Sequence, residues 1–96
     1  MSYRVVWNKS VDRIVRTWRL PDSVFVEMRL RVNLLGENPA SRLVRVKQPV
    51  DGMIYPFRFI DPSNRLCEHT FAFHVFYSQD EETIFIARGT YFQVIG

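Results

Sequence analysis

The feature that most constrains the fold is an alternating run of aromatic and smaller residues in the second half of the chain. Within residues 68–77 one set of alternate positions is Phe71, Phe73, Val75 and Tyr77. A period of two places successive side chains on opposite faces of a β-strand. The segment is therefore predicted to be a strand with one face buried in an apolar core.

Shorter β-branched and aromatic runs predict four more strands. They cover residues 3–7, 42–47, 53–60 and 83–92. Between the first two, Val11, Ile14, Val15 and Trp18 recur at helical spacing, and Ser10 is a good N-cap residue. Pro21 ends this helix, and a second apolar helix continues to Gly36.

This order predicts an α+β fold in one domain, residues 1–96. It comprises an N-terminal strand, a helical hairpin and an antiparallel sheet of three to four strands. A chain of 96 residues is long enough for one core and too short for two. A single cysteine and the lack of a long apolar run favour a cytoplasmic protein without a membrane role.

The cations are unusual in kind, because 11 of the 13 are Arg. Arg is the better phosphate ligand and the better base stacker, but an Arg-favouring genome explains the same bias. On the strand at 42–47, Arg45 and Lys47 share a face, and Arg58 of the next strand is predicted to join them. The alternatives are a cation cluster around a scissile phosphate and an ordinary solvated face.

A second basic group is predicted on the first helix, where Arg13, Arg16 and Arg19 form a stripe. It is either a nucleic-acid-binding surface or a solvated helix face. His69 and His74 are five residues apart and are predicted on opposite faces of one strand, where a packed role is favoured over catalysis. Cys67 with His69 gives too few ligands for a metal, so no metal or cofactor is expected.

The aromatic residues outnumber what one sheet face under two helices can bury. Some are therefore expected on a second apolar surface, which usually marks an interface. We expect Tyr55, Phe57 and Phe59 to bind a partner protein there, or a second copy in a homodimer.

Several segments together resemble the RelE/ParE superfamily of toxins from bacterial toxin–antitoxin modules. The opening YRVVWNKS (residues 3–10) is similar to the first strand of the family, and LLGENP (34–39) to its helix end. Arg58 follows a Gly-containing turn, as the central Arg of the family does. The segment 76–86, with an acidic turn between two strands, resembles the last hairpin of the family.

The resemblance implies a toxin that acts on mRNA or the translation machinery and is neutralised by a small antitoxin. Whether the chain is an enzyme stays open; an active member would be a ribosome-dependent or free endoribonuclease. The positions that match catalytic residues of the family are Arg45, Lys47, Arg58, Arg88 and Tyr91. The alternative is a catalytically inactive module of the same fold that binds protein or nucleic acid.

Overall fold

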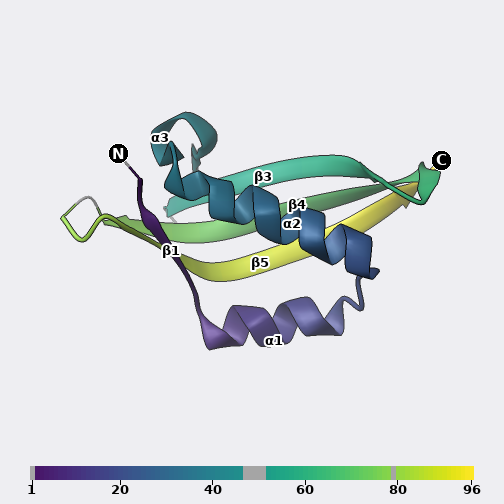
Figure 1. The fold of residues 1–96 in the computed structure, drawn as a ribbon, viewed down its shortest axis with the longest axis horizontal. Helices are drawn as coiled ribbons and strands as arrows, with labels where there is room; N and C mark the ends of the chain where they lie inside the picture. Colours follow the sequence, from purple (N-terminus) through teal and green to yellow (C-terminus); the bar gives the residue numbers. More distant parts are fainter. Residues whose placement is uncertain (1, 47–51, 79) are drawn as a thin grey trace.

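The computed structural model describes residues 2–46, 52–78 and 80–96 and shows helices packed on a five-stranded sheet (Figure 1). Its elements in chain order are β1 (Arg4–Trp7), α1 (Lys9–Thr17), α2 (Asp22–Asn33), the 3-10 turn η1 (Leu34–Gly36), α3 (Pro39–Arg42), β2 (Val44–Val46), β3 (Gly52–Asp61), β4 (Asn64–Ser78) and β5 (Thr83–Ile95).

The α+β class is confirmed, and the first strand, whose pairing was not predicted, joins the same sheet as the antiparallel strands. The strand order is β1-β5-β4-β3-β2. β2 to β5 pair antiparallel, whereas β1 pairs parallel with β5. The sheet is therefore mixed, because the first strand of the chain is placed beside the last one. The predicted strand at 42–47 is also shorter in the described residues, since Arg42 ends α3 and β2 begins at Val44.

The first helix begins two residues earlier than its sequence suggests. Asn8 is the N-cap, and its side-chain oxygen accepts a hydrogen bond from the backbone N–H of Ser10 at 3.0 Å. Asn8 can do this because its extended backbone leaves the side chain beside the unpaired first N–H groups of the helix. The prediction of Ser10 as the N-cap is wrong.

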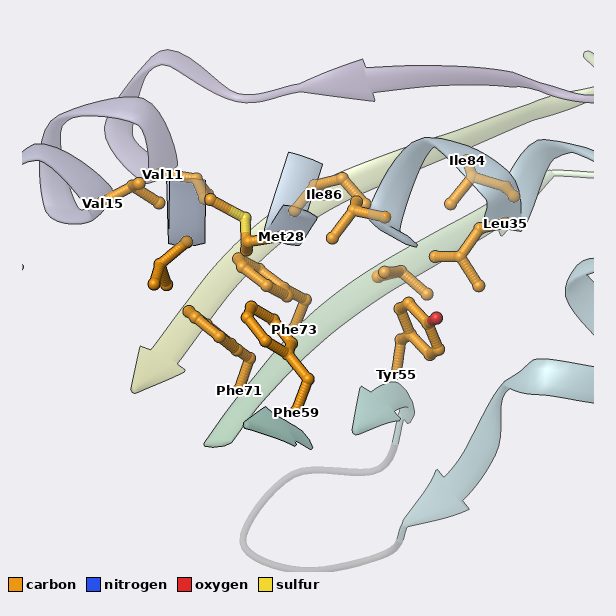
Figure 2. Packing of buried hydrophobic residues seen from close by; sticks show 13 residues of the cluster. Val11, Val15, Met28, Leu35, Tyr55, Phe59, Phe71, Phe73, Ile84 and Ile86 are labelled. Carbon is orange, nitrogen blue, oxygen red and sulfur yellow. The ribbon is translucent and has the colours of Figure 1, made fainter. Parts of the chain in front are cut away.

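The core lies between the two helices and one face of the sheet (Figure 2). Val11 and Val15 reach it from α1, and Met28 from α2. Phe71 and Phe73 of β4 are 1% and 0% exposed and stack at 6.3 Å. The period-two prediction for this strand is confirmed, because its alternate residues form the floor of the core.

Candidate functional site

The sheet face turned away from α1 and α2, which we call the open face, carries exposed aromatic and basic side chains. In the described residues no helix packs against its central strands. Phe76, Phe92 and Phe85 are 67%, 59% and 36% exposed. The prediction of a second apolar surface is confirmed, and Ile60 and Val94, 57% and 49% exposed, extend it along the same face.

The strand register sets the positions of these side chains, because residues directly opposite each other share a face. Three of the rows that cross the open face carry its exposed aromatic and basic side chains: Arg58–Thr70–Phe92, Ile54–His74–Arg88 and Phe76–Phe85. At about 3.3 Å per residue along a strand, the first and second rows are roughly 13 Å apart and the second and third roughly 7 Å. Aromatic and cationic side chains therefore share one face of the sheet, with the row Pro56–Ala72–Thr90 between the first and the second.

A β-bulge at Ala87 reverses the face of the sheet to which the following side chains of β5 point. Val75 pairs with Ile86 and His74 pairs with Arg88, so Ala87 is the extra residue. In a regular strand, Arg88 would point to the same buried face as Ile86, because the two residues are two positions apart. The extra residue reverses the alternation and places Arg88 on the open face.

A hollow lies beside this bulge. It has a volume of about 310 Å³ and is lined by side chains of different chemistry, which include His74, Phe76 and Arg88. Gly52, which contributes no side chain, lies in the same lining. Met53, Val75 and Ala87 complete a lining that is mostly apolar, with the His74 imidazole and the Arg88 guanidinium as its polar groups.

The predicted catalytic residues lie on both sides of the sheet. Arg58 and Arg88 are exposed on the open face, and Arg58 lies 4.0 Å from Glu68 as a weak surface ion pair. Arg45 pairs with Met53, which packs against the core, so Arg45 is on the helix side. The prediction that Arg45 and Arg58 share a face is wrong. Arg45 lies opposite Met53, and Met53 is five residues from Arg58 on β3, so the two Arg side chains are on opposite faces. Lys47 lies outside the described residues.

Tyr91 is also on the helix side and is engaged there. Its ring lies 5.3 Å from that of Trp18, and its hydroxyl is 2.7 Å from Nδ1 of His69. Burial raises the pKa of Tyr91. Tyr91 therefore does not join Arg58 and Arg88 around a common phosphate position.

The predicted partner surface of Tyr55, Phe57 and Phe59 is wrong as well. Tyr55 and Phe59 are only 7% and 9% exposed, and Phe57 packs against the core. The guanidinium of Arg31 from α2 lies 5.1 Å from the ring of Phe59. These three residues face the helices, so they stabilise the fold instead of offering a docking surface.

The basic stripe on α1 is shorter than predicted. Arg13 and Arg16 are exposed on the helix, but α1 ends at Thr17. Arg19 lies in the following loop with a φ of 51°. This group belongs to the helix layer, on the other side of the sheet from the open face, so the two basic regions cannot form one continuous surface.

A buried polar cluster occupies the tip of the β3–β4 hairpin, on the helix side. Nε2 of His69 lies 2.8 Å from Oδ2 of Asp61 and 3.8 Å from Sγ of Cys67. Asp61, Cys67 and His69 are 8%, 5% and 1% exposed. The hydrogen bond from His69 lowers the pKa of Asp61, and the backbone N–H of Ser63 acts in the same direction.

The hydrogen-bond partners assign the imidazole proton. An ionised Asp61 can only accept, so Nε2 of His69 donates to it and Nδ1 accepts from the hydroxyl of Tyr91. A nucleophilic triad needs the thiol and the carboxylate on different ring nitrogens. Here Cys67 and Asp61 both face Nε2, so the cluster is not arranged as a Cys-His-Asp triad.

His74 lies on the opposite face from His69, as predicted, and a packed His69 is also confirmed. Asp61 was not among the predicted site residues, because its contact with His69 spans the hairpin turn. Phe76, Phe85 and Phe92 were not among the predicted partner-binding residues either. The available signal was their spacing, since Phe76 falls on the alternate positions of β4 that the core does not use.

The comparisons with known proteins identify no relative: no family model, curated protein or solved structure matches the chain. Within the described ranges, no helix has the length and apolar character needed to span a membrane.

Proposed function

We propose that the chain binds single-stranded RNA on its open face and serves as a RelE/ParE-like toxin component. The observation that carries the proposal is the placement of three exposed Phe residues and the exposed Arg58 and Arg88 on one face of the sheet. Single-stranded RNA is bound by stacking its bases on aromatic side chains and by cationic contacts to its backbone. Phe76 and Phe92 can stack bases, and Arg58 and Arg88 can hold phosphates.

The mixed chemistry of the open face favours RNA over a protein partner. A protein-binding core is typically depleted of charge, whereas here Arg88 and His74 lie between the aromatic rows. The net charge of +3 also favours an anionic ligand. Exposed rings also favour single-stranded RNA over a double helix, because the bases of a single strand can be splayed out and stacked on them.

The RelE/ParE part of the proposal is supported by the order of elements. A first strand, two helices and an antiparallel set of strands follow each other as the resemblance implies. In that setting the natural partner is a small antitoxin, and the target is mRNA or the translation machinery. The geometry supports RNA binding better than RNA cleavage, because Arg45 and Tyr91 are on the other side of the sheet from Arg58 and Arg88.

The test is fluorescence anisotropy with a labelled single-stranded RNA of mixed sequence and a matched duplex. Phe76→Ala and Phe92→Ala should each weaken single-strand binding about 5- to 150-fold, because one stacked base contributes about 1–3 kcal/mol. Arg88→Ala should reduce the magnitude of the salt slope by about 0.7, which corresponds to one single-strand phosphate contact.

The matched control is Leu30→Ala, which truncates a 55% exposed apolar residue on α2. It should leave RNA affinity unchanged. Equal affinity of wild type and Phe76→Ala would contradict the proposal. So would a homodimer, seen by sedimentation, that buries Phe76 and Phe92 and binds no RNA.

A further inference from the structure

The polar cluster at the hairpin tip has the composition of a transition-metal site. Asp61 ends β3, and Cys67 and His69 lie two residues apart on β4, so the hairpin brings all three to the helix side. Their ligand atoms, a carboxylate oxygen, a thiol sulfur and an imidazole nitrogen, all lie within 4.8 Å of one another. All three residues are buried.

The orientation of His69 is the second observation that indicates a metal. Its Nε2 faces both other donors, while its Nδ1 is held by the hydroxyl of Tyr91 at 2.7 Å. Metal-binding histidines have this arrangement, in which one nitrogen binds the ion and the other is fixed by an outer partner. The aromatic rings of Phe59 and Tyr91 lie 5.9 Å and 5.8 Å from the imidazole and restrict its rotation.

Two of the three donor separations lie near those around a tetrahedral ion. Zinc bonds of about 2.0–2.3 Å at tetrahedral angles separate N from S by roughly 3.6 Å and N from O by roughly 3.4 Å. The N–S distance here is 3.8 Å and the N–O distance is 2.8 Å. The shorter distance is that of a hydrogen bond, and it would lengthen on metal binding, when the ring proton moves to Nδ1, which then donates to the Tyr91 hydroxyl, and the ion takes its place at Nε2.

We propose that Asp61, Cys67 and His69 bind a divalent first-row transition metal of the Zn²⁺ class. A thiolate and an imidazole select such ions over Mg²⁺ and Ca²⁺, which prefer oxygen ligands. The fourth position is left for water or for Gln93, whose Oε1 lies 3.4 Å from Sγ of Cys67. The ion would link β3 to β4 at the hairpin tip, and the hydrogen bond between His69 and Tyr91 would connect it to β5.

The experiment is a titration of the chelator-treated, full-length protein with Co²⁺ and Zn²⁺. Co²⁺ should produce a thiolate-to-metal charge-transfer band that saturates at one equivalent. Cys67 is the only cysteine of the chain, so this band assigns the ligand without a variant. Zn²⁺ should displace Co²⁺, and Zn²⁺ at 100 times its Kd should raise the Tm by roughly 10–20 °C.

Two variants then test Asp61 as a ligand and Tyr91 as the outer partner of His69. Asp61→Asn keeps an oxygen that accepts from His69 but is a poorer ligand, so Co²⁺ affinity should fall at least 10-fold while the metal-free fold is kept. Tyr91→Phe should weaken binding about 10- to 100-fold, because it removes the outer partner of His69. Asp80→Asn, at an exposed carboxylate in the last loop, is the matched control and should have no effect.

Two outcomes would overturn the proposal. One is a wild-type spectrum without a charge-transfer band at stoichiometric Co²⁺. The other is a band whose midpoint is the same in folded Asp61→Asn and in Asp80→Asn. The wild-type spectrum decides the matter even where a variant fails to fold.

Discussion

Replacing Gly89 by Ala should destabilise the protein, although Ala is the better strand residue. Gly89 lies on β5 directly opposite Phe73 of β4, on the helix side. A Cβ atom there would lie 2.8 Å from Cε1 of Phe73 and 3.2 Å from Cη2 of Trp18. Phe73 is 0% exposed and is also packed edge-on against Trp7 at 5.5 Å, so it has little room to move.

Two effects of opposite sign set the magnitude. Overpacking a well-packed core costs about 1–3 kcal/mol. Replacing a glycine inside a strand by alanine raises the free energy of unfolding by about 0.5–1 kcal/mol. The free energy of unfolding of Gly89→Ala should therefore fall by roughly 1–2 kcal/mol, which lowers the Tm of a domain of this size by roughly 4–16 °C.

The assay is urea unfolding followed by tryptophan fluorescence, with Trp18 as a reporter at the site. Gly52→Ala is the matched control: it is the same substitution in a strand, but nothing lies within 4 Å of the added Cβ. It should be neutral or slightly stabilising. Phe73→Leu should partly relieve Gly89→Ala in a double-mutant cycle. Equal stability of the two glycine variants would refute the reasoning.

Two further predictions concern the first helix and the proposed toxin. Asn8→Ala should lower the free energy of unfolding by about 1 kcal/mol, because it removes the cap, whereas Ser10→Ala should cost less than about 0.5 kcal/mol; urea midpoints compare them. Induced expression in a bacterium without a cognate antitoxin should stop growth, and Arg58→Ala or Arg88→Ala should relieve the arrest while Arg45→Ala, on the other face, should not. Normal growth at high soluble expression would contradict the toxin part of the proposal.

The sequence predicted best what depends on neighbouring residues. The burial of Phe71 and Phe73 follows from alternation within one strand, and the position of α1 follows from the spacing of Val11 and Val15. Both patterns are local, and the residues that they predict as buried are the ones that pack in the core. The side on which His69 and His74 lie was predictable for the same reason.

What could not be predicted depends on pairing between distant segments. Arg45 and Arg58 are on different strands, so their faces depend on how β2 pairs with β3, and neither strand encodes that register alone. Likewise, Asp61 reaches His69 only because the hairpin turn follows it at once. Tyr55 and Phe59 could equally have faced either layer until α2 was placed above them.

The bulge at Ala87 connects the two sites of the molecule. With regular alternation from Ile86 onward, Tyr91 would point to the open face and Phe92 into the helix layer. The one extra residue gives His69 its hydroxyl partner and, in the same strand, adds Phe92 and Arg88 to the open face. The proposed RNA surface and the proposed metal site therefore depend on the same backbone irregularity. Because an inserted residue has no signature in the apolar pattern of β5, the faces on which Arg88, Tyr91 and Phe92 lie could not be predicted before the strands were paired.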